Sequence, residues 1–192
     1  MALSEAALAA LIATCAPSVH LTTMAAVVRV ESSGDPFALN VNKARRQPPP
    51  ASSAAEAARV ARWYISKGYS VDLGLGQVNN RNLGWLGLSI EEALDPCTNL
   101  AAGARILTDA YRRVSQGQPD AQAALKAALS AYNTGSPVKG FLNGYVAKYY
   151  PDGTSKTAET ATLSYPMPAT TDDVGSAYAG TILAIMGDID DK

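Results

Sequence analysis

Histidine, cysteine and net charge are all scarce in this sequence, and each shortage excludes a class of protein. The 192 residues include one histidine and two cysteines, and 16 Lys+Arg against 17 Asp+Glu give a formal net charge of −1. A metal site needs several grouped ligands, and a lone His20 supplies neither these nor a credible Ser-His-Asp or Cys-His arrangement. We therefore expect no metal and no cofactor, and we interpret His20 as a helix-start or surface residue.

Blocks of like charge are also missing. Only 17% of the residues are charged and 47% are hydrophobic, which is not typical of a disordered tail or of a protein held to nucleic acid by phosphate contacts. No basic stripe runs among the nine Tyr, two Trp and two Phe. We expect an uncharged or mixed-charge partner and no nucleic acid. Trp63 and Trp85 are candidates for stacking on sugars, but core packing is the favoured interpretation.

No hydrophobic run is long enough to cross a membrane. The longest, over residues 6–16, is interrupted by Thr14 and falls short of the roughly 18 residues that a membrane span needs. We therefore expect no stable membrane insertion. A secretory signal would place Lys or Arg before such a run, yet the first cation is Arg29. Either the protein is not exported, or its signal has been removed from this sequence.

The length suits one domain that buries roughly 70% of its unfolded surface. Helical signals outnumber strand signals, so we predict a mainly α fold with six or seven helices and two or three short strands. The domain is expected over residues 1–150. Thr, Ser, Pro and Asp dominate from residue 151 to 192, which predicts a partly ordered tail with at most one short docking helix over 178–186.

Apolar spacing and capping residues place the elements. Leu8, Leu11, Ile12 and Cys15 form one helical stripe, and Asp95-Pro96 and Asp120 are each expected to begin a helix. A capping box of Ser52 or Ser53 with Glu56 predicts a further helix, which ends before Gly68. The remaining expectations are short strands within 37–42 and 70–80, an exposed loop over 43–51, and a final short helix over 138–150.

Glu31 is the most informative residue, because it continues the helical stripe of Met24, Val27 and Val28. A carboxyl group in apolar surroundings has a raised pKa, and an acid that keeps its proton near neutral pH can donate it to a leaving oxygen. The alternative is an acid in the last helical turn that bends to solvent or caps a neighbouring group.

Two other segments could line a site. Tyr132-Asn133 precedes Gly135 at a predicted helix end, which suits a phenol that contacts sugar and an amide that fixes a loop. Gly74-Leu75-Gly76-Gln77 would let the backbone approach a ligand. The alternatives are a core tyrosine, an ordinary helix cap and a plain turn.

Taken in order, three segments resemble the signatures of soluble lytic transglycosylases. They are Glu31-Ser32-Ser33-Gly34-Asp35-Pro36, Gly74-Leu75-Gly76-Gln77-Val78-Asn79 and Ala131-Tyr132-Asn133-Thr134-Gly135. The resemblance covers residues 15–150. The stretches 72–79, 82–89 and 94–100 look closer still to the transglycosylases of type IV secretion and conjugation systems. Gly76 stands where many relatives carry Met, and Ser33-Gly34 where an aromatic residue is common.

The resemblance implies an α+β fold like goose-type lysozyme, in which a helical bundle and a small β-sheet line a cleft for the glycan strand of peptidoglycan. Glu31 matches the single catalytic acid of the family. The positions that match its substrate-contacting residues are Ser32, Gln77, Asn79, Tyr132, Asn133 and Tyr145.

The implied reaction is cleavage of the β-1,4 bond between N-acetylmuramic acid and N-acetylglucosamine, with formation of a 1,6-anhydro sugar. It would open the cell wall locally for a secretion apparatus. One alternative is a hydrolysing lysozyme, in which Asp35 or Asp72 would position water. The other is a silent module that binds peptidoglycan and assists assembly.

Cys15 and Cys97 allow a single pairing, and the residues alone leave open a disulfide or two buried thiols. Cysteine use in the resembled subfamily favours the disulfide, and with it an oxidising compartment. The resemblance thus implies a periplasmic protein whose signal is absent from this sequence. Its expected partners are glycan strands and secretion-system subunits, and we expect a monomer.

Overall fold

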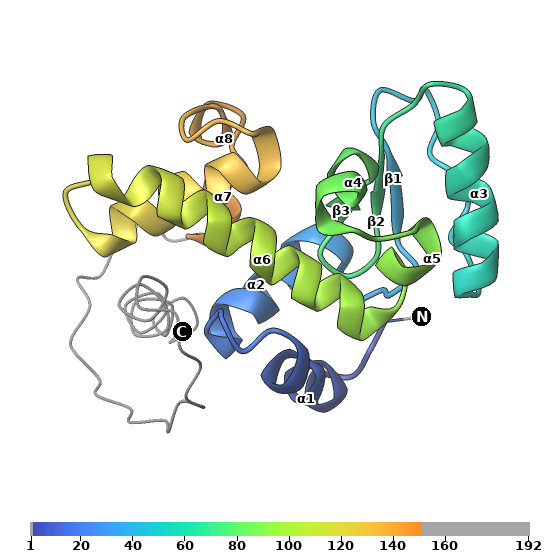
Figure 1. Cartoon of the computed structure of the whole chain (residues 1–192), viewed down its shortest axis with the longest axis horizontal. Helices are drawn as coiled ribbons and strands as arrows, with labels where there is room; N and C mark the ends of the chain where they lie inside the picture. The colour runs from blue at the N-terminus through green and yellow to red at the C-terminus, as the bar shows by residue number, and fades with distance from the viewer. Residues whose placement is uncertain (1, 151–192) are drawn as a thin grey trace. The chain divides into compact units, whose positions relative to one another are not determined.

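The computed structural model describes residues 2–150, and most of this part of the chain is helical (Figure 1). The predicted mainly α class is confirmed. The expected tail and its docking helix lie outside the described residues, so the domain assignment stays a prediction. The helices are α1 (Glu5–Cys15), α2 (Leu21–Ser32), α3 (Ala54–Ser66), α4 (Leu83–Leu86), α5 (Ile90–Ala93), α6 (Pro96–Val114), α7 (Ala121–Thr134) and α8 (Lys139–Leu142).

Three short strands and three 3-10 turns complete the described elements. The strands are β1 (Leu39–Val41), β2 (Val71–Leu73) and β3 (Val78–Asn79), and the 3-10 turns are η1 (Asn80–Asn82), η2 (Ser115–Gly117) and η3 (Val146–Tyr149). Two compact units divide the described chain: residues 2–17 with 27–104, and residues 18–26 with 105–150. Helices α2 and α6 each begin in one unit and end in the other.

The first unit contains an antiparallel sheet in the order β1-β2-β3, with the strands side by side in Figure 1. Alternate residues of a strand point to opposite faces. Val41, Val71, Leu73 and Val78 are buried, whereas the register aligns Asn40, Asp72 and Asn79 in one polar row across the three strands. The sheet therefore has an apolar face toward the core and a polar face.

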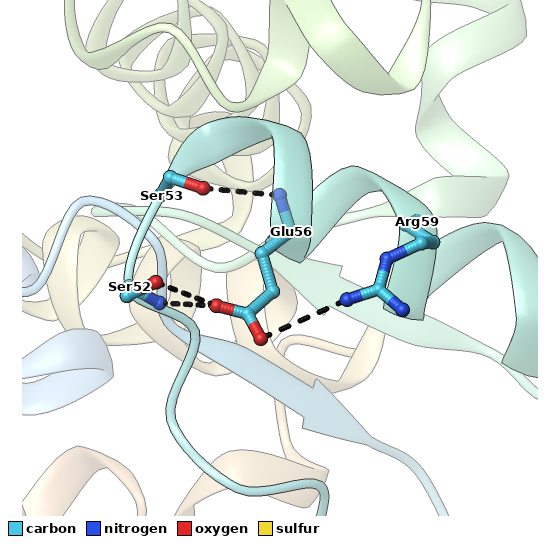
Figure 2. Close-up of polar contacts among 4 residues, drawn as sticks. All are labelled: Ser52, Ser53, Glu56 and Arg59. Atoms are coloured by element: carbon cyan, nitrogen blue, oxygen red, sulfur yellow. Dashed lines mark hydrogen bonds and ion pairs between the residues drawn. The ribbon is translucent and has the colours of Figure 1, made fainter.

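Helix α3 begins with the predicted capping box, but two serines divide its two halves between them. Ser53 Oγ accepts a hydrogen bond from the Glu56 backbone N–H at 3.2 Å, while Glu56 Oε2 accepts from the backbone and hydroxyl of Ser52 at 2.8 and 2.7 Å (Figure 2). Arg59 lies 3.8 Å from the other carboxylate oxygen. Both serines that the sequence offered as caps are used, one by the backbone and one by the side chain of Glu56.

The other predicted helix starts are also confirmed. Asp95 Oδ1 accepts hydrogen bonds from the backbone and hydroxyl of Thr98 at the start of α6, at 2.9 and 2.8 Å. Asp120 Oδ1 accepts from the Ala123 backbone N–H at 2.7 Å at the start of α7. A capping box that the sequence analysis missed, formed by Ser89 and Glu92, begins α5. Each carboxylate satisfies backbone donors that the helix leaves without partners.

Cys15 and Cys97 form a disulfide, with their Cα atoms 5.3 Å apart. The alternative of two reduced thiols is therefore wrong for this structure. The bond joins the last residue of α1 to the first turn of α6, and both residues belong to the first unit. It fixes the beginning of the helix that supports the sheet, as described below.

Two expectations about local structure are wrong. The single helix expected over 138–150 is divided into α8 and η3, because Gly144 between them adopts a left-handed backbone (φ 78°) that cannot continue a helix. Core packing of the tryptophans is also wrong: Trp63 is 56% exposed and Trp85 46%. Trp63 lies on the face of α3 opposite the buried Ala57, Ala58 and Ala61, and the ring N–H of Trp85 donates to Asn82 Oδ1 at 3.2 Å.

Each unit has its own buried apolar residues. The first buries Ile12, Val27, Leu73, Leu75, Leu94 and Leu100, and the second buries Met24, Leu107, Leu125 and Leu129. Within residues 2–150, no helix combines the length and the apolar character needed to span a membrane.

Removal of the disulfide should destabilise the protein. In the chain-entropy account, opening a loop that joins residues 82 positions apart lowers the free energy of unfolding by at most about 4 to 5 kcal/mol. We expect Cys15→Ser to unfold at a lower temperature than the oxidised wild type, and reductant to lower the wild type toward the variant. Thermal unfolding of both proteins with and without reductant measures this. Identical transitions under all four conditions would contradict the prediction.

The capping carboxylates should make stability depend on acid pH. Hydrogen bonds from Ser52, Ser89 and Thr98 lower the pKa of Glu56, Glu92 and Asp95, respectively, below their ordinary values. Their stabilising effect is present above the unfolded-state pKa and is lost as pH falls through the lower folded-state value. Between about pH 5 and about pH 2, the melting temperature should fall more for the wild type than for a Glu56→Gln, Glu92→Gln, Asp95→Asn variant. Parallel curves would contradict this assignment.

Candidate active site

Glu31 lies in the last turn of α2, at the end of the predicted apolar stripe. Met24, Val27 and Val28 are fully buried, whereas Glu31 itself is partly exposed. The stripe is therefore confirmed, and its acid occupies the border between the core and the surface. That position combines low-dielectric surroundings on one side with access from outside on the other.

The chain turns sharply directly after Glu31. Ser32 Oγ donates to the Val28 carbonyl at 3.1 Å and accepts from the Gly34 N–H at 3.2 Å. Ser33 (φ 53°) and Gly34 (φ 81°) both adopt the left-handed conformation, which is unfavourable for a serine. The hydroxyl of Ser32 is thus used to end α2 and to fix the backbone that follows the acid.

The turn between β2 and β3 carries Gln77, the third predicted site residue. Gly74 (φ 71°) and Gln77 (φ 49°) are both left-handed. Gln77 Nε2 donates to the carbonyls of Gly74 and Ala38, at 2.9 and 3.1 Å. Because Ala38 belongs to the segment that joins α2 to β1, this amide ties the turn to the chain that follows Glu31.

A buried amide that the sequence analysis missed holds the same turn from behind. Asn99 of α6 is fully buried; its Oδ1 accepts from the Gly76 N–H at 2.7 Å, and its Nδ2 donates to the carbonyls of Leu73 and Ala93 at 2.8 and 2.6 Å. A Cβ at Gly74 would lie 2.6 Å from Asn99 Nδ2, so only glycine fits there. The available signal was a polar residue on the apolar stripe of α6, four positions before Gly103.

Asn79, the fourth predicted residue of this unit, belongs to the polar row of the sheet. Asp72 Oδ1 accepts from Asn79 Nδ2 at 2.6 Å, and Asp72 Oδ2 accepts from the amides of Asn40 and Asn42 at 3.0 and 2.8 Å. Asn79 Nδ2 also donates to Ser70 Oγ at 2.7 Å. One carboxylate therefore organises three amide side chains on the polar face of the sheet.

The second unit contains the other three predicted site residues. Asn133 is exposed and Tyr132 partly exposed in the last turn of α7, which ends at the left-handed Gly135 as the sequence predicts. Asn133 Oδ1 accepts from Asn143 Nδ2 at 3.1 Å, and Asn143 Oδ1 accepts from the Tyr145 N–H at 3.0 Å. Asn143 thus links Asn133 to Tyr145.

Tyr145 is buried rather than open to solvent. Its hydroxyl lies 2.6 Å from that of Tyr149, and the two rings pack edge to face at 5.4 Å. The preceding loop is fixed by buried Ser130, whose Oγ donates to the Ser136 carbonyl at 2.6 Å and accepts from the Gly140 N–H at 2.8 Å. These contacts keep the end of α7 and the segment over 136–145 in one arrangement.

The predicted site residues thus form two groups, one in each unit. Glu31, Ser32, Gln77 and Asn79 lie in the first unit, and Tyr132, Asn133 and Tyr145 in the second. The ring of His20 stands 3.0 Å from the Thr22 hydroxyl and accepts from the Thr22 N–H, which is the predicted helix-start role. Across residues 2–150, no group of three or more His, Cys, Asp or Glu side chains is arranged to hold a metal ion.

Comparison with known proteins places this arrangement in a class. The family described as "Transglycosylase SLT domain" matches residues 9–149, which include every predicted site residue. A mainly α fold with a small sheet agrees with this class of domain. No solved structure matches the chain.

The curated relatives give a narrower placement. The chain is 40% identical over 134 residues to "Protein virB1" of Rhizobium radiobacter, which covers 70% of this chain and 55% of that protein. It is 38% identical over 174 residues to "Type IV secretion system protein virB1" of Brucella abortus, covering 88% of this chain and 72% of the relative. The Brucella suis protein of the same name is 39% identical over 176 residues. The chain belongs to the transglycosylase SLT domain family, and within it resembles the virB1 proteins.

Replacement of Asn99 should disturb the site from its buried side. Asn99→Ala leaves one N–H and two carbonyl groups without their partner, so we expect the unfolding free energy to fall by about 3 to 5 kcal/mol. Asn82→Ala, a partly exposed control in the same unit, should change it by less than about 1 kcal/mol. Denaturant unfolding measures both. Equal effects of the two substitutions would contradict the role assigned to Asn99.

Proposed function

We propose that this protein is a lytic transglycosylase that cleaves the glycan strands of peptidoglycan. Family membership and the virB1 relatives support this proposal. The chain spans about half the length of the Rhizobium relative, 55%, so activity, substrate and partners are proposed here for the chain itself.

The observation that carries the proposal is the placement of the carboxylates in the first unit. Glu31 ends a buried stripe and is partly exposed. The two acids that could act as a second catalytic carboxylate are both used by the fold: Asp35 Oδ1 accepts from the Phe37 N–H at 3.1 Å, and Asp72 accepts from three amide side chains. Ordinary glycosidases need two acting carboxylates, so one acting acid favours a route that needs no second one.

In the first step, Glu31 acts as the general acid. It donates its proton to the glycosidic oxygen, and the bond from that oxygen to the anomeric carbon of N-acetylmuramic acid breaks. The N-acetyl group of the same sugar stabilises the positive charge at the anomeric carbon, which replaces the missing carboxylate nucleophile.

In the second step, Glu31 acts as the general base. As a carboxylate, it takes the proton of the 6-hydroxyl of N-acetylmuramic acid, and that oxygen bonds to the anomeric carbon. The product is a 1,6-anhydro sugar, no water is consumed, and Glu31 regains its proton for the next cycle.

The other predicted residues are proposed to hold and contact the substrate. Gln77 is partly exposed, and its Oε1 accepts no hydrogen bond from residues 2–150, so it can accept one from a sugar. Exposed Asn133 and partly exposed Tyr132 are proposed to contact the strand. Ser32, Asn79 and Tyr145 are engaged within the protein, and we propose that they position these groups.

The proposed setting is the periplasm, at a type IV secretion apparatus. The disulfide supports an oxidising compartment. The Brucella relatives are named as proteins of type IV secretion systems. We propose that the chain acts as a monomer on glycan strands and opens the wall where the apparatus assembles.

Glu31→Gln should abolish turnover while leaving the fold intact. Loss of the general acid is expected to reduce the release of anhydro products from purified sacculi by about 100- to 10,000-fold. Glu5→Gln, which changes an exposed acid in the first turn of α1, should retain wild-type activity. Chromatography with mass analysis of the released sugars measures both.

Three outcomes of that experiment would contradict the proposal. Turnover by Glu31→Gln at the wild-type rate would remove the catalytic role of Glu31. Wild-type products heavier by one water would indicate a hydrolysing lysozyme. Absence of any product from the wild type, with binding to sacculi retained, would indicate a silent binding module.

A further inference from the structure

The loop between β1 and α3 presents a concentration of positive charge that the reaction does not use. Lys43, Arg45 and Arg46 are all exposed and lie within four positions of one another, in a protein whose total charge is only −1. Among residues 2–150, none of the three forms an ion pair or a side-chain hydrogen bond. Residues 43–51 are called the basic loop below.

The basic loop is fixed at two points, its middle and its end. At its middle, the Gln47 side chain accepts from the Val41 N–H at 2.7 Å and donates to the Val41 carbonyl at 2.9 Å, so it pairs with the outer edge of β1 as a neighbouring strand would. At its end, buried Ala51 leads directly into the contacts between Ser52 and Glu56 that begin α3 (Figure 2). Three consecutive prolines, residues 48–50, restrict the backbone between these points.

The backbone of the loop is also strained at one of its cations. In the part of the chain that the structure describes, three residues other than glycine have a positive φ: Ser33, Gln77 and Lys43. Ser33 and Gln77 belong to the candidate active site. Lys43 (φ 63°) is the third, and nothing in the reaction accounts for it. Strain of this kind persists where the surrounding structure enforces it, and it gathers at functional positions.

Strand β1 connects the chain that follows Glu31 to the basic loop. The segment after Glu31 enters β1 at Leu39, next to Ala38, whose carbonyl binds Gln77. The basic loop leaves β1 after Val41, and the three residues of the strand span about 10 Å. A glycan strand that lay along β1 from its Leu39 end would therefore bring its substituents toward the basic loop.

We propose that the basic loop binds the carboxylate groups of the peptide stems that peptidoglycan carries. This inference rests on the proposed function, because it names the part of that substrate which the loop recognises. The sugars of a peptide-bearing strand are uncharged, whereas the stems carry free carboxylates. Arginine binds carboxylates through two parallel hydrogen bonds, and lysine adds a mobile positive charge.

The affinity from this loop is expected to be moderate and salt-dependent. Exposed ion pairs contribute little individually, so three together should strengthen binding by about tenfold at low ionic strength. Screening by salt should remove most of this gain. The loop would thus favour strands that bear peptides over bare ones without holding the enzyme in place.

Binding is tested with the full chain carrying Glu31→Gln, so that the sacculi stay intact. One form keeps the basic loop, a second carries Lys43→Gln, Arg45→Gln and Arg46→Gln, and a third, the control, carries Lys67→Gln, Arg112→Gln and Lys139→Gln. The control loses the same charge at exposed positions elsewhere. Cosedimentation is measured with native sacculi, with sacculi whose carboxylates are converted to neutral amides, and with glycan stripped of its peptides.

We expect the loop variant to bind native sacculi about tenfold more weakly than the intact loop and the control. All three proteins should bind the amidated sacculi and the stripped glycan equally. Equal binding of all three to native sacculi would overturn the inference, and would leave an acidic protein partner as the remaining reason for the loop. Stronger binding by the intact loop that persists on stripped glycan would also overturn the inference. That glycan has no peptide stems, so the loop would then be binding the lactyl carboxylate of the sugar instead.

Turnover by proteins that keep Glu31 separates this inference from the proposed function. If the wild type releases anhydro sugars while the loop substitutions leave binding to native sacculi unchanged, only the inference about the loop fails. If no protein releases such sugars, the proposed function fails, whatever the binding assay shows.

Discussion

The buried side chain of Asn99 makes the hydrogen bonds on which the candidate-site residues of the first unit depend. It joins the first turns of α6 to both sides of the turn between β2 and β3. Asp95 and the disulfide at Cys97 fix the same end of α6. Since Gln77 extends from that turn to Ala38, the position of the chain after Glu31 is determined through a continuous series of polar contacts. A buried amide can do this because each unmade bond would be costly.

This arrangement explains why several motif residues that resemble substrate contacts are occupied within the protein. The hydroxyl of Ser32 ends α2, and the amide of Asn79 belongs to the row organised by Asp72. We propose that such residues serve the reaction by keeping others in place. In the proposed reaction a single acid acts in both steps, and Glu31 would then have to face both the leaving oxygen and the 6-hydroxyl, which makes this support more important.

Local signals predicted much of the fold. Asp95, Asp120 and the serines before α3 begin helices as expected, since a cap depends on residues three or four positions away. The role of Asn99 could not be predicted in this way, because its partners in Leu73 and Gly76 are 26 and 23 positions distant. Exposure of Trp63 likewise depends on which face of α3 meets the sheet. In the site, the stripe at Glu31 was predictable from spacing, whereas the function of each motif residue depended on contacts between segments.

The central claim is that Glu31 transfers a proton from the substrate's own hydroxyl and that no water enters the product. Digestion of purified sacculi in heavy-oxygen water, followed by mass analysis of the released sugars, tests it most directly. The account predicts anhydro products that contain none of the heavy isotope. One heavy oxygen at the new reducing end of every product would contradict it and would identify the enzyme as a hydrolase.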